Sequence, residues 1–548
     1  MEQTKDLRTS LRGFLPCGAF LLYTVLFFVT SVFHEPWLDE AQSWLIARDA
    51  SFHDMVFVLP HYEGHPPFWW LLLSLPAKLG LDYEMSLTVI SCAVFAAISF
   101  LVIFRSPFPL YVRLLLPLSY HIFYGYGVIA RPYGICILAF ILMGITYKER
   151  DEKPFLYIFA NILACSATAF AVVLCGGLAL CWCIDLFREY RKDIPSFFRN
   201  KRFFALLLLL CFALFELYLF IPYEDTFSYS EDPLTAGAFL HGMYYMLLML
   251  PADALLIGTG MGLGGQVKYS SFLPREYLSM TVVSLAMYFF LFRLLLRKNK
   301  AKEFVLPYVL LSAFGAGVYF TVHHEGMVFV FILFVLWICF DSKEDRALKI
   351  DGYINRAKAD RLGLCLLAGS AALECIWSAV DITADIRGNF YYGREVAAYL
   401  KETGLWERNI MTPFYENADS SFLSTNKQET AATVNPYFDK NIFFGLNSGN
   451  EGYIIHRNSE EINEKNLAEW KNTVPDVLIG EPDLLTAYGR DSGIGNSDYI
   501  LINTFPFAQL VKMGGYTTYT SVYLRKDLFK EYPDIQPQNE MDREFISP

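Results

Sequence analysis

The sequence predicts a mainly α-helical membrane protein that carries a soluble α/β domain at its C-terminal end. Of the 548 residues, 54% are hydrophobic and 18% are charged, which is too apolar for a soluble chain of several domains. Apolar runs long enough to span a bilayer recur up to about residue 381. Beyond that point the chain is polar and free of cysteine. We therefore expect a transmembrane domain over 1–381 and a soluble domain over 382–548.

Charge and cysteine usage exclude two classes of protein. The formal net charge of −11 argues against a nucleic-acid partner, because neutralising phosphates requires a basic surface. Nearly all of the 11 cysteines sit within apolar runs, where they resemble small buried hydrophobes rather than a disulfide framework or a zinc site.

The first apolar run predicts an uncleaved membrane helix. It covers residues 14–33 behind a basic N-terminus and so resembles a signal peptide. Its length of about twenty residues suffices to span a bilayer, and Thr30-Ser31-Val32 is a poor cleavage site. We expect it to remain as the first span, with the N-terminus in the cytoplasm.

Basic segments such as 148–153 and 188–202 belong in the cytoplasm, and their positions predict the membrane topology of the rest of the chain. The later spans are expected near 85–104, 112–127, 132–147, 155–168, 169–187, 203–221, 278–296, 304–322, 326–340 and 362–381. Counting 66–79 and 239–257 as well would place the cluster 188–202 outside, against the positive-inside rule. We therefore predict 11 spans (range 11–13) in the plasma membrane, with those two stretches as juxtamembrane or re-entrant helices on the outer face.

The same threading places the soluble domain and all nine histidines outside. The histidines are His34, His53, His61, His65, His121, His241, His323, His324 and His456. Histidines that serve only as polar helix ends should divide between the two faces. The one-sidedness therefore suggests an outward-facing polar site.

The soluble domain has the pattern of a small α/β fold. Residues 394–403 are typical of a helix, and 475–480, 499–503 and 516–524 are typical of strands. We find no nucleotide-binding glycine motif in its sequence.

An acidic pair lies where the first span should leave the bilayer, at the start of the first outer loop, 34–84. Asp39 and Glu40 stand between Trp37 and Trp44. If the pair begins a helix, Asp39 faces one side and Glu40 points about 100° away, so that one carboxylate can meet a reacting group. The alternative is a pair favoured by the helix dipole, with the tryptophans as interface anchors. Spacing alone leaves both open.

Three further motifs lie on the same predicted side. His65 precedes two prolines at the positive end of a predicted helix, where an anion can bind. Arg131 lies between two apolar runs and can hold a phosphate bidentately. His323-His324 lies at the outer end of a span, where either ring can meet a phosphate or a metal. Each motif has an alternative reading. His65 and His323-His324 can be simple helix caps, and Arg131 can be an arginine that snorkels to the interface.

This combination, in this order and on one face, resembles the C-type (GT-C) glycosyltransferases that use polyprenyl-phosphate sugars. The resemblance is greatest to the group of protein O-mannosyltransferases, aminoarabinose transferases and Rgt-like membrane enzymes, and it covers residues 14–340. It implies transfer of a hexose or related sugar from a polyprenyl-phosphate carrier, held among membrane lipids, to an extracytoplasmic glycan, lipid or protein.

The resemblance also implies roles for individual residues. Asp39 matches the catalytic aspartate that activates the acceptor, and Glu40 matches its acidic neighbour. The residues expected to bind the donor phosphate are His65, Arg131 and Tyr133, with Arg48, His323 and His324 as further candidates. No cofactor is required by the sequence, but some relatives bind a divalent metal near the phosphate; here Glu63, His65 and His324 are the candidates.

The alternative from another class is a transporter or flippase of lipid-linked sugars. Such a protein should carry polar or broken helices at the bilayer midplane and often an internal repeat. The charges of this chain lie mostly at the ends of the apolar runs, with Glu216 as the exception, which favours the enzyme.

Overall fold

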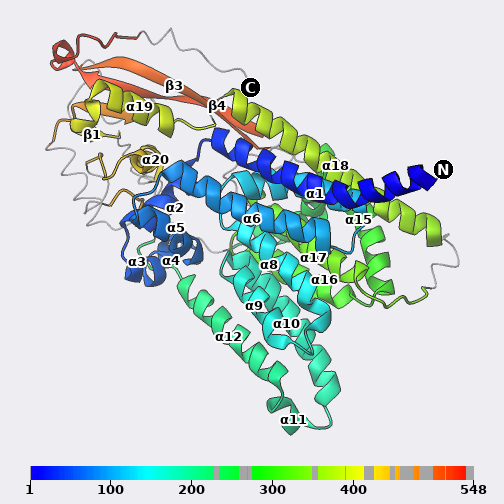
Figure 1. The fold of residues 1–548 in the computed structure, drawn as a ribbon. Helices are drawn as coiled ribbons and strands as arrows, with labels where there is room; N and C mark the ends of the chain where they lie inside the picture. Colours follow the sequence, from blue (N-terminus) through cyan, green and yellow to red (C-terminus); the bar gives the residue numbers. More distant parts are fainter. Residues whose placement is uncertain are drawn as a thin grey trace.

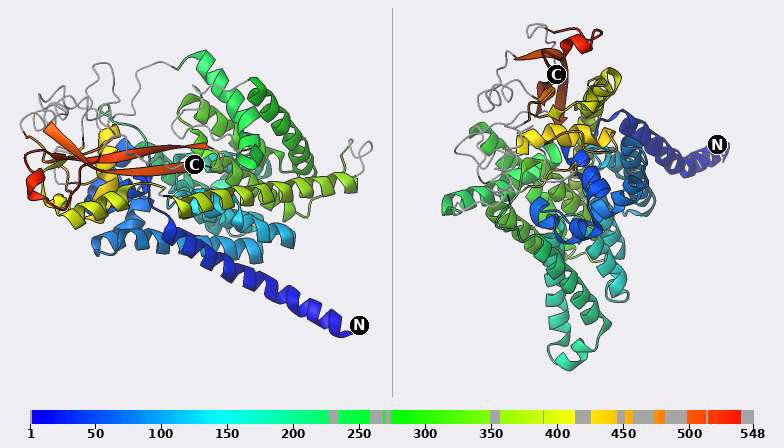
Figure 2. Two further views of the ribbon diagram at one scale, coloured as in Figure 1. Left: turned by 90° about the horizontal axis from the view of Figure 1, so that it is seen from above. Right: turned by 90° about the vertical axis from the view of Figure 1, so that its left-hand side faces the viewer.

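The computed structural model forms a helical bundle with a small sheet domain at one end (Figure 1). It describes residues 2–226, 234–257, 268, 274–348, 356–388, 390–412, 425–444, 451–456, 473–480, 498–511 and 514–538. The sheet, α19 and the segment α2–α5 occupy one end of the molecule, and the beginning of α1 lies at the other end (Figures 1 and 2).

The helices up to residue 257 are α1 (Glu2–Phe33), α2 (Leu38–Asp49), α3 (Phe52–Phe57), α4 (Pro60–Glu63), α5 (Phe68–Lys78), α6 (Tyr83–Arg105), α7 (Leu110–Leu115), η1 (Leu116–Leu118), η2 (His121–Val128), α8 (Tyr133–Thr146), η3 (Tyr147–Glu149), α9 (Pro154–Cys165), α10 (Ala169–Tyr190), α11 (Ile194–Phe198), α12 (Lys201–Leu219), α13 (Ala236–Tyr244), η4 (Tyr245–Met249), α14 (Leu250–Ala252) and η5 (Asp253–Ile257). The later helices of the bundle are α15 (Pro274–Arg297), α16 (Ala301–Gly317), η6 (Val322–His324), α17 (Gly326–Phe340) and α18 (Arg356–Arg387).

Among the described residues, seven helical segments are long and apolar enough to cross a membrane. The other predicted spans are shorter in the structure. The run 112–127 is divided among α7, η1 and the π-helix η2, and α17 has 15 residues. Nearly all of α17 is buried, which a hydrophobic helix at the centre of a bundle requires. The chain is thus mainly helical, as predicted, with several spans assembled from short pieces.

The stretch predicted as a second outer re-entrant helix is one of the seven by length and composition, Ala236–Leu255. Its assignment as a re-entrant helix stays a prediction. At its start, Gly242 packs against Ala316 near the end of α16, and at its end the carbonyl of Leu255 accepts from Ser370, in the middle of α18. Lys268 then lies back beside Gly242 and donates to the carbonyl of Val318. Gly242 and Lys268 thus both contact the end of α16.

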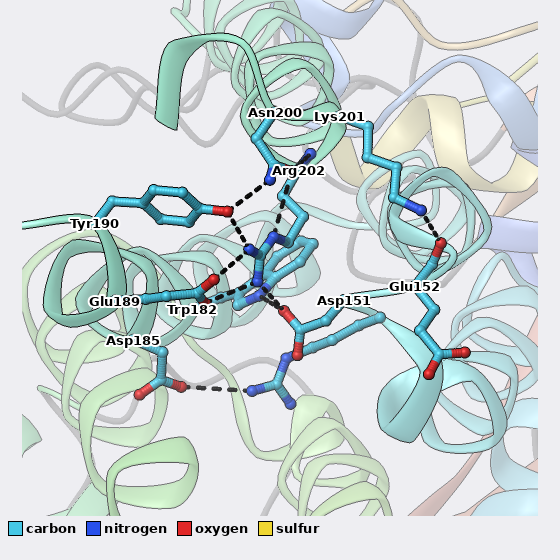
Figure 3. Close-up of polar contacts among 10 residues, drawn as sticks. Asp151, Glu152, Trp182, Asp185, Glu189, Tyr190, Asn200, Lys201 and Arg202 are labelled. Atoms are coloured by element: carbon cyan, nitrogen blue, oxygen red, sulfur yellow. Dashed lines mark hydrogen bonds and ion pairs between the residues drawn. The ribbon is translucent and has the colours of Figure 1, made fainter. Parts of the chain in front are cut away.

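The two basic segments assigned to the cytoplasm meet at one end of the bundle, as the threading requires. Figure 3 shows Arg202 at the start of α12 donating to Asp151 (3.1 Å), to Glu189 (2.6 Å) and to the hydroxyl of Tyr190 (2.5 Å). Asp151 precedes α9 and also accepts from Trp182 of α10 (3.0 Å). The cluster therefore ties together α9, α10 and α12.

The C-terminal domain contains a four-stranded sheet in the order β1-β2-β4-β3. Its elements are α19 (Gly393–Thr403), η8 (Leu405–Glu407), β1 (Ile410–Met411), α20 (Thr425–Val434), η9 (Asn435–Tyr437), β2 (Val477–Gly480), β3 (Tyr499–Val511), β4 (Gly514–Arg525) and η11 (Phe529–Glu531). β1 is parallel to β2, and the other pairs are antiparallel. The predicted helix and the three predicted strands are all present, and β3 continues past the expected end. Val396 and Leu400 of α19 share a core with the sheet.

One boundary differs from the expectation. The helix α18 continues to Arg387, past the predicted domain boundary at 381. Its last turns carry Asp381 and Asp385, whose side chains are buried in the bundle. This end of α18 lies against the loop after α1 that holds the acidic pair.

Candidate functional site

The acidic pair begins a helix, as both readings of the sequence require. The chain leaves α1 at Phe33, turns through Pro36 and starts α2 at Leu38. The carboxylate of Glu40 accepts from the backbone N–H of Trp37 (3.1 Å), which satisfies one of the free donors at the helix start. The two carboxylates therefore project in different directions, with Asp39 half-buried and Glu40 fully buried.

Asp39 forms an ion pair with Arg131, and His65 completes the cluster. One guanidinium nitrogen of Arg131 donates to the Asp39 carboxylate, and the other lies 3.3 Å from His65 Nε2. The side chain of Arg131 is only 8% exposed, whereas that of Asp39 is 35% exposed. An incoming ligand can therefore reach the carboxylate, while the guanidinium is held from behind.

His65 is placed to accept a hydrogen bond from the Arg131 guanidinium rather than to compete with it. Burial lowers the pKa of His65, Glu63 opposes that shift, and His456 adds to it. The imidazole is therefore neutral at physiological pH, and its unprotonated nitrogen can face the guanidinium. Gly64 makes the turn between Glu63 and His65 with φ of 65°, a conformation that a glycine adopts without strain.

Glu40 holds the segment that carries Arg131. Its carboxylate accepts from the backbone N–H of Ala130 (2.6 Å) and lies 3.1 Å from His34 Nε2. The other nitrogen of His34 is 2.7 Å from Asp385 on α18. Burial alone would lower the pKa of His34, but Asp385 and Glu40 together raise it to about 10. A buried imidazolium thus joins two carboxylates, and one of these fixes Ala130 beside Arg131.

Tyr133 and the histidine pair form the next layer around Arg131. The guanidinium lies 5.5 Å from the centre of the Tyr133 ring, and that ring stacks on Tyr126 at 4.5 Å. The hydroxyl of Tyr126 donates to the carbonyl of His323 (3.2 Å). His324 is buried, and its pKa is lowered by burial, by His323, by Arg131 and by His65. These aromatic contacts connect the Arg131 segment to η6.

Arg48 lies outside this cluster. Its guanidinium pairs with Asp49 (2.6 Å and 2.9 Å) and donates to the backbone carbonyls of Asn435 (3.2 Å) and Phe438 (2.5 Å). It stands at the end of α2, about 13 Å along the helix from Asp39 at 1.5 Å per residue. These contacts join the Arg48 guanidinium to its neighbour on α2 and to the C-terminal domain.

The three metal candidates do not come together as a ligand set. Across the part of the chain that the structure describes, no group of three His, Cys, Asp or Glu side chains is placed to hold a metal ion. Glu63 instead accepts from Gln42 Nε2 (2.9 Å) and lies 3.6 Å from His456 Nε2.

Sequence reasoning did not single out four residues that fix the cluster: His34, Gln42, Asp385 and His456. His34 and His456 belong to the one-sided set of histidines, which was the available signal. Gln42 shares a helix face with Asp39, and Asp385 was assigned to the soluble domain.

A cavity of about 350 Å³ lies elsewhere, between α15, α17 and α18. Its lining is mostly apolar, with Arg293 and Arg297 at one end beside Asp360. Asp360 and Asp385 are separated by most of the length of α18, about 37 Å at 1.5 Å per residue. The cavity is therefore distinct from the cluster at Asp39.

No protein-family model matches this chain, and no curated protein matches its sequence. Among solved structures, the chain is similar to two of ArnT from Cupriavidus metallidurans. The structure bound to undecaprenyl phosphate is 13% identical with a TM-score of 0.42, covering 92% of this chain and 97% of that one. The apo structure is 14% identical with a TM-score of 0.44, covering 94% and 98%. The functional proposal therefore rests on the side chains and motifs of the chain itself.

Proposed function

We propose that the chain is a membrane glycosyltransferase that moves a hexose or related sugar from a polyprenyl-phosphate carrier to an extracytoplasmic glycan, lipid or protein. The observation that carries the proposal is the contact of Asp39 with Arg131, with His65 beside it. Sugar transfer from a lipid phosphate needs a carboxylate near the acceptor and cationic groups at the leaving phosphate. The three side chains supply both within one cluster.

The reaction assigns each group a step. The acceptor oxygen attacks the anomeric carbon, the bond from that carbon to the phosphate oxygen breaks, and the electron pair leaves with the polyprenyl phosphate. Asp39 takes the proton of the acceptor hydroxyl. Arg131 holds the phosphate bidentately as its charge grows, and neutral His65 adds a hydrogen bond.

The ion pair sets an order of events. Asp39 is a weak base while it is bound to Arg131, because the guanidinium stabilises its charge. A donor phosphate that takes the guanidinium would release the carboxylate for the acceptor. The donor therefore binds first, and its arrival creates the base.

The remaining candidates have supporting roles in this proposal. Glu40 fixes the backbone at Ala130 and so positions Arg131. Tyr133, His323 and His324 enclose the phosphate end through the stack on Tyr126. Arg48 is left out of the donor site, because its contacts are to the C-terminal domain.

The proposal is tested by supplying the purified protein with a panel of polyprenyl-phosphate sugars, radiolabelled in the sugar, together with membrane extract. We expect label to leave the carrier and appear on an acceptor for at least one donor. The transporter alternative predicts that label crosses a proteoliposome membrane while it stays on the carrier. Movement of intact lipid-linked sugar without transfer would overturn the enzyme proposal.

A further inference from the structure

A segment of the C-terminal domain lies on the helix that carries Asp39. The backbone N–H of Ile454 donates to Gln42 Oε1, and the carbonyl of Ile454 accepts from Gln42 Nε2, both at 2.8 Å. The N–H of Gly452 donates to Asp49 (3.0 Å) at the end of the same helix. Residues 452–454 are buried. The segment 451–456, which we call the strap, is therefore held along α2 by main-chain hydrogen bonds.

The close fit at Gly452 makes this placement specific. A Cβ at that position would lie 3.1 Å from Arg48 and 3.2 Å from Asp49. Arg48 is itself bound to the carbonyls of Asn435 and Phe438 of the same domain. The strap and Arg48 thus form one interface between the domain and α2.

Gln42 passes this contact on to the cluster. It lies almost one turn after Asp39 on α2, and its Nε2 also donates to Glu63 Oε1 (2.9 Å). Glu63 is joined through the tight turn at Gly64 to His65, which meets Arg131. The contacts therefore close a ring from Asp39 through Gln42, Glu63, His65 and Arg131 back to Asp39.

His456, at the end of the strap, completes the surroundings of Glu63. Its Nε2 lies 3.6 Å from Glu63 Oε1, and its backbone carbonyl accepts from the hydroxyl of Thr226 (3.2 Å), which also holds the strap. The side chain of Glu63 is 9% exposed and that of His456 is 25% exposed. His456 thus lies beside a carboxylate that also accepts from Gln42.

We propose that the C-terminal domain is part of the donor-phosphate end of the site and that His456 is a positioning residue. It holds Glu63 and, through the Gly64 turn, keeps His65 against Arg131. This inference rests on the proposed function, because it assigns the domain to a site for polyprenyl phosphate. It gives the domain a role in binding the donor, whatever acceptor the enzyme uses.

The test measures binding rather than turnover. The probe is a fluorescent polyprenyl phosphate without a sugar, titrated into the full-length protein in detergent. We expect His456→Ala to weaken its binding about tenfold, because the contact of His456 with the Glu63 carboxylate is lost and His65 is freed to move. His456→Gln can still donate to Glu63 and should bind within about threefold of wild type.

Two controls separate the possible outcomes. His53, whose side chain is 73% exposed on α3, provides a matched variant, His53→Ala, that should bind as wild type does. Arg131→Ala should lose binding. Wild-type affinity in His456→Ala, alongside loss in Arg131→Ala, would overturn the role of His456 and leave the proposed function intact. Absence of binding to the wild-type protein would overturn both. Equal loss in His456→Ala and His456→Gln would assign His456 to folding of the strap and refute the proposal.

Discussion

The buried imidazolium of His34 gives a prediction that can be worked out in detail. His34 is 3% exposed and lies between Asp385 and Glu40, each of which is 1% exposed. The change to test is His34→Gln, which keeps a polar side chain and removes the positive charge. Breaking a buried ion pair by removing one partner costs on the order of 3–5 kcal/mol, because a charge is left buried without compensation.

The pH dependence follows from the sign of the pKa shift. The pKa of His34 rises from 6.5 to about 10 on folding, so the folded protein holds a proton that the unfolded chain releases. The stabilisation is fully present below pH 6.5 and is lost as the pH rises toward 10. Between these values the contribution of His34 to the free energy of unfolding should fall by about 1.4 kcal/mol for each unit of rising pH.

Thermal unfolding in detergent at pH 6.5, 8 and 9.5 measures this contribution. We expect a large difference in stability between wild type and His34→Gln at pH 6.5, and we expect the difference to shrink steadily toward pH 9.5. Other titrating groups are common to both proteins and cancel in the difference. His53→Ala, at an exposed histidine, should follow wild type throughout. A constant difference across the pH range would refute the assignment of the charge to His34.

Three further changes test the cluster around Arg131. Arg131→Lys keeps the charge but loses the bidentate geometry, so we expect the donor KM to rise about tenfold or more in steady-state transfer assays, and an unchanged KM would contradict the phosphate role. Gly64→Ala forces a φ of 65° on a residue with a Cβ, although that Cβ would meet nothing within 4 Å. The stability should therefore fall by about 1–2 kcal/mol through backbone strain alone. Gly176→Ala, also in open space but at an ordinary φ, should not lower the melting temperature. Gly326→Ala would drive a methyl group into the ring of Tyr126, and the thermal stability should fall by about 1–3 kcal/mol unless that ring can move freely.

Sequence reasoning grouped residues correctly where the predicted side of the membrane was enough to bring them together. Asp39 and His65 lie in one loop and Arg131 in another, and the positive-inside rule alone assigned both loops to one face. Distance along a helix was not weighed in the same way. Arg48 was grouped with the site although it stands two and a half turns from Asp39 on α2, by 3.6 residues per turn.

Some contacts could not be predicted, because only one of the two partners is recognisable in the sequence as a candidate site residue. The partner of His34 on α18 is 351 residues away, and a short error in the end of that helix assigned Asp385 to another domain. The partner of Gln42 is the backbone of Ile454, and every residue offers the same N–H and carbonyl. Such pairings depend on how two domains pack, which periodicity and composition do not encode.

The most direct test of the central claim is the rate of sugar transfer by Asp39→Asn at saturating donor, measured beside the affinity for polyprenyl phosphate. The amide keeps the size of the side chain, cannot take the acceptor proton, and leaves Arg131 free for the phosphate. We predict that donor affinity is retained or improved while transfer falls by about 10²–10⁴-fold, the range for loss of a general base. Transfer within a few-fold of wild type would contradict the assignment of Asp39 as the base.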